Sequence, residues 1–234
     1  MANSTEKDDH SSAKPLKWVG LWSYKLFSEL NLSIWETSQK AIEDRTKSSW
    51  FQMLLNLSKY IDANVSRDAQ HASLMGYWVK PVAYQLGFNI EGIQDIYYAA
   101  LFHDIGKIAI STQVLTKPGP LSTEEWSVMK LHPVIGANII KAYPDLAHIA
   151  PYIYFHQEKY DGSGYPDGLR GNEIPIGARL LAVLDAYEAM ISDRYYRKAL
   201  GHDYAVQELR CQCGQQFDKL VVETFLDVLD WLWS

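Results

Sequence analysis

Apolar residues recur at intervals of three and four along most of the chain, and polar residues fill the positions between them. The spacing is clear in residues 54–61, 74–86, 93–100 and 176–191, and it is typical of helices that bury one face. A last amphipathic helix is predicted for residues 218–233. No stretch alternates apolar and polar residues as a half-buried strand does. The sequence therefore predicts an all-α fold.

Two segments interrupt the helical pattern and are predicted to be loops. Residues 160–175 are rich in Gly, Pro and Asp, which favour turns. The segment KPGPLSTEE, residues 117–125, contains Pro-Gly turn signals, and its Ser122 and Glu125 have the spacing of a capping box. The second loop therefore leads into a further helix.

The first fifty residues differ from the rest. Residues 1–15 are polar and are predicted to be a disordered tail. Residues 16–50 carry aromatic residues among polar ones, which indicates an amphipathic helical extension. The pattern leaves open whether its apolar face packs on the main core, contacts a second copy, lies on a membrane surface or is the remnant of a sensory module. Residues 51–234 are expected to form the main domain.

Composition narrows the class of protein. Of the 234 residues, 47% are hydrophobic, which is enough for a sizeable core in one large domain. Cys211 and Cys213 are the only cysteines, and a pair so close gives no disulfide framework. A net charge of −6 without a basic run argues against a nucleic-acid polymer as partner. With no long apolar stretch and no signal-peptide pattern, no transmembrane segment is predicted and a cytoplasmic location is expected.

Histidines and aspartates stand at places where predicted helices end or bury a face. His103 and Asp104 follow an apolar helical stretch, and His132 stands directly before a proline. His156 is predicted to lie on a helix just before the glycine-rich loop. Asp185 lies among apolar residues of a predicted helix, where an unpartnered carboxylate would be costly to bury. Because imidazole and carboxylate together suit first-row transition metals, we predict a metal site.

Several motifs follow one another in a fixed order. They read LFHDIGKIAI, KPGPLSTEEW, LHPVIGANII and HQEKYDGSGYPDGLRGNEIPIGARLLAVLDAYEAMISDRYYR, with GQQFD at 214–218. Together they resemble the HD-GYP family, a subgroup of the HD-domain metal phosphohydrolases, from near Ser58 to near Leu226. The resemblance implies that residues 51–234 form an HD-GYP catalytic domain, an HD-domain helical bundle with a GYP loop. It also implies a site for two or three metals and hydrolysis of the bacterial second messenger c-di-GMP.

The resemblance also implies roles for individual residues. Asp104 and Lys107 match catalytic positions: Asp104 would bridge two metals, and Lys107 would lie beside the scissile phosphate. The matching metal ligands are His71, His103, Asp104, His132, His156 and Asp185. The matching substrate-binding residues are Gly164, Tyr165, Pro166, Arg194 and Arg197.

Two of the positions that depart from the family's pattern concern metal ligands. Gln157 stands where the family usually has a ligand histidine, and Arg67 stands where some members supply a ligand glutamate. A neutral amide is a poorer ligand for a transition metal than imidazole, and a cation cannot ligate. We therefore expect two transition-metal ions rather than three, iron or manganese first, with nickel, cobalt and zinc as alternatives.

The implied reaction is the attack of water on phosphorus with the ribose 3′-oxygen leaving, which converts c-di-GMP to pGpG and leaves a second cut to GMP open. Two alternatives stay open. Gln157 favours a degenerate HD-GYP module that binds c-di-GMP or a signalling partner without turnover. The other is an HD phosphohydrolase acting on a nucleotide or on a mixed cyclic dinucleotide such as cGAMP. The protein partners considered are a diguanylate cyclase (GGDEF) domain and a second copy of the chain.

Overall fold

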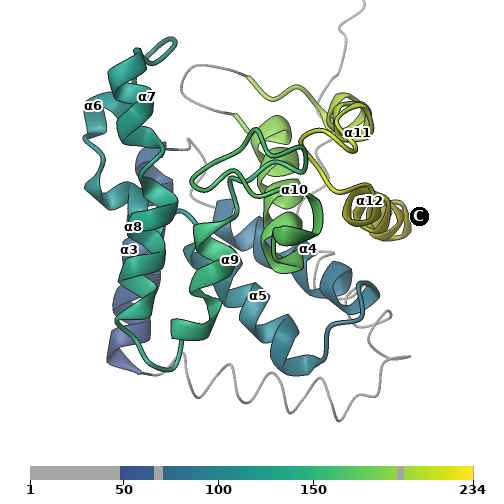
Figure 1. Cartoon of the computed structure of the whole chain (residues 1–234), viewed down its shortest axis with the longest axis horizontal. Coiled ribbons are helices and arrows are strands. Elements are labelled where there is room, and N and C mark those ends of the chain that lie inside the picture. Colours follow the sequence, from purple (N-terminus) through teal and green to yellow (C-terminus); the bar gives the residue numbers. More distant parts are fainter. Residues whose placement is uncertain (1–47, 66–70, 194–197, 234) are drawn as a thin grey trace, which may run out of the picture. The chain divides into compact units, whose positions relative to one another are not determined.

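The computed structural model describes residues 48–65, 71–193 and 198–233, without the side chains of residues 64, 65, 71–74 and 233. All of them belong to one compact unit, residues 38–234. In this part of the chain every regular element is a helix, and one isolated bridge joins Cys213 to Phe217 (Figure 1). The predicted all-α fold is confirmed. The predicted tail at 1–15 lies outside the described residues, as does the extension at 16–50 except for its last three residues.

The helices follow one another along the chain in a fixed order. The α-helices are α3 (Ser49–Val65), α4 (His71–Gln85), α5 (Ile90–Phe102), α6 (Thr112–Leu115), α7 (Thr123–Met129), α8 (His132–Lys141), α9 (Ala150–Tyr154), α10 (Ile176–Ile191), α11 (His202–Cys211) and α12 (Lys219–Trp233). Three short 3-10 helices lie between them: η2 (Ile105–Ala109), η3 (Ala147–Ile149) and η4 (Gly171–Glu173). Among the described residues, no helix combines the length and apolarity needed to cross a membrane.

Helix α5 is fixed at both ends. At its start the Asn89 side chain accepts a hydrogen bond of 2.9 Å from the Gly92 N–H, which caps the first turn. Near its end, Tyr98 and Phe102 meet Phe51 of α3 edge to face, with ring centroids 5.3 and 5.4 Å apart. The two residues after α5 are the histidine–aspartate pair of the sequence, so that pair leaves the end of a buried, anchored helix.

A second aromatic cluster anchors α10. Tyr187 of α10 contacts Trp78 of α4 at 5.2 Å and Phe225 of α12 at 5.0 Å, in both cases edge to face. Each such contact adds about 0.5–1.5 kcal/mol beyond the burial of the rings. Because Asp185 is two residues before Tyr187, this cluster also fixes the turn of α10 that carries Asp185.

The backbone of η2 touches the first turns of α8. A Cβ atom on Gly106 would lie 2.0 Å from the carbonyl oxygen of His132 and 2.5 Å from the amide nitrogen of Gly136. Only glycine permits so close an approach. The contact brings the segment that begins at Asp104 against the beginning of α8.

Several local predictions are confirmed. α10 spans Ile176–Ile191 as expected, and α12 begins at Lys219, one residue later than expected. The capping box is present at the start of α7, where Glu125 N donates to Ser122 Oγ at 3.2 Å and Ser122 N donates to Glu125 Oε2 at 2.7 Å. Residues 160–175 form a loop whose only regular element is η4.

The expected position of His156 on a helix is wrong. α9 ends at Tyr154, and His156 lies in the turn that follows, closed by a 3.0 Å hydrogen bond from Glu158 N to Phe155 O. The glycine-rich segment beyond it does not continue a helix. The proline after His132 lies in the first turn of α8, where its missing N–H would have no partner in any case.

Candidate metal centre

Five of the predicted metal ligands converge from four parts of the fold. His103 and Asp104 follow α5, His132 begins α8, His156 follows α9, and Asp185 lies in the middle of α10. The three histidines are buried, with at most 2% of their surface exposed. The Asp185 side chain keeps 24% of its surface exposed. The core therefore covers the set except where Asp185 reaches the surface.

The three imidazoles are held in the same way. In each of them Nδ1 bonds to the carbonyl oxygen of the residue three positions earlier, at 2.9 Å for His103, 2.8 Å for His132 and 2.7 Å for His156. A carbonyl oxygen only accepts, so Nδ1 carries the proton. Each ring therefore directs Nε2 away from the backbone, which is the arrangement of a metal-binding histidine whose other nitrogen is fixed.

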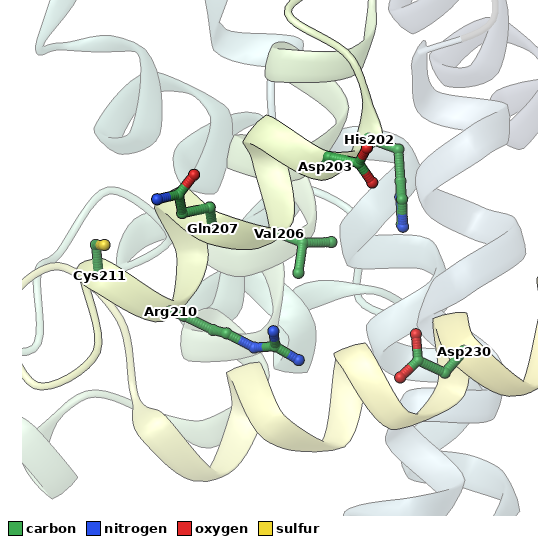
Figure 2. A pocket seen from close by; sticks show the side chains of 7 residues that line it. All are labelled: His202, Asp203, Val206, Gln207, Arg210, Cys211 and Asp230. Carbon is green, nitrogen blue, oxygen red and sulfur yellow. The ribbon is translucent and has the colours of Figure 1, made fainter.

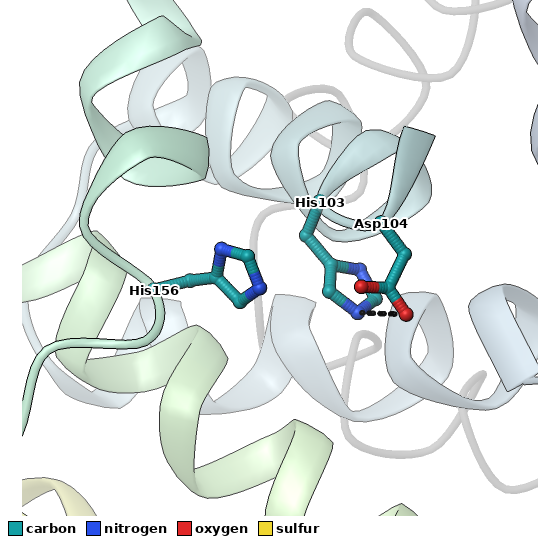
Figure 3. Close-up of side chains that lie close together, drawn as sticks. All are labelled: His103, Asp104 and His156. Carbon is teal, nitrogen blue, oxygen red and sulfur yellow. Dashed lines mark ion pairs between the residues drawn. The ribbon is translucent and has the colours of Figure 1, made fainter. Parts of the chain in front are cut away.

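The Nε2 atoms face one another and the carboxylates. His132 Nε2 lies 3.3 Å from His156 Nε2. Asp104 directs Oδ1 to His132 Nε2 and Oδ2 to His103 Nε2, both at 3.5 Å, and Asp185 Oδ1 lies 3.9 Å from His103 Nε2. Figure 3 shows His103 and Asp104 side by side with His156 facing them from a separate segment. One ligand atom each from His103, Asp104 and His156 lies within 4.8 Å of the others.

Electrostatics keep two of these rings neutral. Burial lowers the pKa of His132 to about 4, although the Asp104 carboxylate opposes the shift. Burial, together with His103 and His132, lowers the pKa of His156 to about 3. Two unprotonated Nε2 atoms at 3.3 Å have no hydrogen atom to share, and a cation is what such a pair accommodates. Nitrogen and oxygen donors in this number fit a first-row transition metal.

Lys107 lies directly on this group. Its Nζ is 2.5 Å from Asp104 Oδ2, and only 15% of its side chain is exposed. The 3-10 helix η2 places the two residues one turn apart. A fixed positive charge therefore lies beside the carboxylate that faces two of the histidines.

Gln157 connects Asp185 to the glycine-rich loop. The Gln157 amide donates to Asp185 Oδ2 at 3.4 Å, and its oxygen accepts from the Tyr165 hydroxyl at 3.2 Å. Burial and the nearby carboxylates raise the pKa of Tyr165, so its hydroxyl remains a donor at neutral pH. The position that the resemblance assigns to a ligand histidine thus holds a side chain that bridges a carboxylate and a tyrosine.

The glycine-rich loop is held against the segment after His156. It carries the predicted substrate-binding residues Gly164, Tyr165 and Pro166. A Cβ on Gly164 would lie 2.2 Å from Lys159 N, so only glycine fits there. The buried Glu158 carboxylate accepts from Asp167 N at 2.7 Å and Gly168 N at 3.0 Å. Glu158 positions the loop and was missed by sequence reasoning, although it stands two residues after His156.

Residues 55–221 match the family described as HD domain. The chain belongs to the HD domain family. The family match and the curated relatives together confirm the resemblance to the HD-GYP proteins, a subgroup of that family. The cyclic di-GMP phosphodiesterase response regulator RpfG of Xanthomonas campestris is 38% identical over 191 residues, covering 81% of this chain and 50% of that protein. A cyclic di-GMP phosphodiesterase of Thermotoga maritima is 37% identical over 177 residues, covering 75% of this chain and 47% of that protein.

A solved structure supports the fold of the HD domain. It is a cyclic GMP-AMP specific phosphodiesterase of Vibrio cholerae, with a TM-score of 0.58 at 15% identity. The match covers 76% of this chain and 48% of that one. The chain spans about half the length of the curated relatives named above.

Three predicted site residues cannot be compared with the rest. His71 is the first residue of α4, but its side chain lies outside the described atoms. Arg194 and Arg197 lie outside the described residues altogether. A ligand role for His71 and a substrate-binding role for the arginines therefore stay predictions.

A separate hollow lies between α11 and α12 of this HD domain. Its volume is about 540 Å³, and its lining includes His202, Arg210 and Asp230 (Figure 2). None of its lining residues is among the predicted metal ligands. Nδ1 of His202 lies 2.8 Å from the Tyr187 hydroxyl, which ties the start of α11 to α10.

Proposed function

We propose that this HD domain is a metal-dependent phosphodiesterase that hydrolyses c-di-GMP to linear pGpG. One observation carries the proposal: three buried imidazoles and two carboxylates direct their ligand atoms at one another. The names of the two curated relatives support the choice of c-di-GMP.

Two transition-metal ions are the proposed cofactors. His103, Asp104, His132, His156 and Asp185 would hold them, and the resemblance adds His71. Asp104 directs its two oxygens at two different histidines, which supports a bridging role between two ions. Iron or manganese is proposed first, with nickel, cobalt and zinc as alternatives, since all of them accept imidazole and carboxylate. When bound, such ions lower the pKa of a water molecule and offset negative charge on phosphoryl oxygens.

The residues of the chain itself supply charge and position. Lys107, at 2.5 Å from Asp104, keeps a cation next to the ligand group, where negative charge develops on a phosphoryl oxygen during displacement. The Tyr165 hydroxyl is a donor at the rim of the same group. Arg194 and Arg197 are proposed to contact the nucleotide, since the planar fork of arginine suits phosphate and guanine.

Gln157 supports a second candidate function. A module with a weakened metal site would bind c-di-GMP, a diguanylate cyclase (GGDEF) domain or a second copy of itself without turnover. In that case the amide at the ligand position bridges Asp185 and Tyr165 and leaves one ion poorly held.

The decisive experiment is elemental analysis of protein purified without oxygen, paired with identification of the products formed from c-di-GMP. Two ions per chain and release of pGpG are expected. Binding of c-di-GMP without any product would support the second candidate. Full turnover by protein from which every metal has been removed would refute the proposal.

A further inference from the structure

Two aromatic rings and a lysine form a corner beside the metal centre. Trp126 lies on α7, Lys130 follows the end of that helix, and Tyr165 comes from the glycine-rich loop. The Trp126 and Tyr165 rings lie 6.2 Å apart, with their planes at 79°. Lys130 Nζ lies 5.9 Å from the first ring centre and 5.7 Å from the second. We call these three residues the aromatic corner.

The aromatic corner is continuous with the metal centre. The Tyr165 ring lies 6.5 Å from the imidazole of His132. Trp126 therefore contacts Tyr165, which in turn lies beside His132, a predicted metal ligand. Of the Trp126 surface, 44% is exposed. A group attached to a phosphate held at the metal centre would therefore meet these rings.

The geometry fits a flat heterocycle. Rings at 79° to each other let a base stack on one ring while its edge points at the other. Nucleobases commonly stack on aromatic side chains in this way. Tyr165 is a half-buried wall of the corner and Trp126 is its exposed wall.

Lys130 adds a preference among bases. A lysine ammonium only donates, so it reads acceptors on a base edge. Guanine presents N7 and O6, both acceptors, whereas adenine presents one acceptor and one donor amine. Within the described part of the chain, Lys130 Nζ contacts the Trp126 and Tyr165 rings and makes no salt bridge, so it can donate to a ligand.

We propose that the aromatic corner is a nucleobase subsite that selects guanine: the base stacks on Trp126 and turns an edge to Tyr165, and Lys130 donates to its acceptor edge. The inference rests on the proposed function, since it assigns one base of the cyclic dinucleotide to a place beside the scissile phosphate.

The test compares c-di-GMP, 3′3′-cGAMP and c-di-AMP as ligands, through KM, kcat and the calorimetric Kd of the metal-loaded chain. Trp126→Ala should raise KM and Kd for all three about tenfold, the loss of one stacked base, with kcat changed much less. Trp126→Phe should recover most of the loss. Lys130→Met should raise KM and Kd for c-di-GMP about tenfold and those for c-di-AMP much less, because adenine offers one acceptor where guanine offers two. Val128→Ala, an exposed change on the same helix, serves as the matched control.

The outcomes separate this inference from the proposed function. If the wild type hydrolyses c-di-GMP and neither variant changes KM or Kd, the nucleobase subsite is refuted and the proposed function is retained. If the variants weaken binding but no nucleotide is hydrolysed, the nucleobase subsite is retained and the proposed hydrolysis is refuted. An equal effect of Lys130→Met on all three ligands would reduce Lys130 to a general phosphate contact and overturn the guanine preference. A wild type that binds none of them overturns both.

Discussion

At the scale of single residues, Asp104 and Lys107 contact each other, but their substitutions should have different effects. Asp104→Ala removes both oxygens that face His103 and His132, so bound metal and hydrolysis should be lost together. Lys107→Ala removes a charge beside the site without removing a ligand, so metal should stay while kcat falls about 10²–10³-fold. Metal content and rate should be measured on the same samples.

The control for these two variants is Lys219→Ala. Lys219 lies at the start of α12 with 72% of its side chain exposed, and its removal should change neither quantity. Loss of metal from Lys107→Ala would contradict the role given to that lysine. Full metal content with full turnover in Asp104→Ala would contradict the metal centre itself.

Gln157 is the residue on which the number of ions depends. Gln157→His should raise metal occupancy and activity, because an imidazole would replace an amide near Asp185. Loss of a side chain that binds the metal directly should reduce metal affinity or activity by more than the roughly 10–100-fold typical of side chains that only contact such a ligand. Metal counted per chain before and after the change is the measurement. An unchanged count would mean that Gln157 serves to position Asp185 and Tyr165, and three tightly bound ions in the wild type would refute the expected two.

At the scale of elements, the contact between η2 and α8 depends on Gly106. In Gly106→Ala the new Cβ would meet backbone atoms of His132 and Gly136, which cannot rotate away. We expect a loss of about 1–3 kcal/mol or more in the free energy of unfolding, together with weaker metal binding because Asp104 and His132 separate. Denaturant unfolding and metal titration would measure the two effects.

Gly92→Ala is the matched control for Gly106→Ala. There the new Cβ would meet Phe88 Cδ1 at 2.9 Å and Asn89 Oδ1 at 3.2 Å, both of them atoms of side chains that can move. The control should retain metal affinity. Equal damage from both substitutions would show that the close approach at Gly106 has no special role in the site.

Elements dominated by local sequence were predictable. The capping box at Ser122 and the apolar face of Ile176–Ile191 depend on residues within a few positions of one another. His156 was placed on a helix because periodicity does not show where a five-residue helix ends. The pairing of Trp126 with Tyr165 joins residues thirty-nine positions apart, and it depends on how α7 packs against the loop. No local pattern contains that information.

At the scale of the whole molecule, the buried histidines link stability to pH. The pKa values of His132 and His156 are depressed in the folded chain, to about 4 and about 3, against about 6.5 in an unfolded one. The unfolded state therefore binds more protons below about pH 6.5. The free energy of unfolding should therefore be highest above that pH and should decrease as the pH falls towards 4.

Thermal unfolding of metal-free protein between pH 7.5 and 4.5 would measure this loss. His132→Gln should flatten the dependence on pH, since one of the two groups no longer titrates. Equal slopes in the wild type and His132→Gln would contradict the assignment of the effect to the buried rings.

The hydrogen bonds from Nδ1 to the main chain have a consequence for motion. A cation on Nε2 would withdraw electron density from the ring and make Nδ1–H a stronger donor, so an ion would tighten each of the three turns that end at a histidine. The coupling is reciprocal, because a turn that opens also rotates its imidazole out of reach. Amide hydrogen exchange in these turns should therefore slow when metal is added, and the ratio of exchange rates would report the free energy of coupling between the ion and the turn.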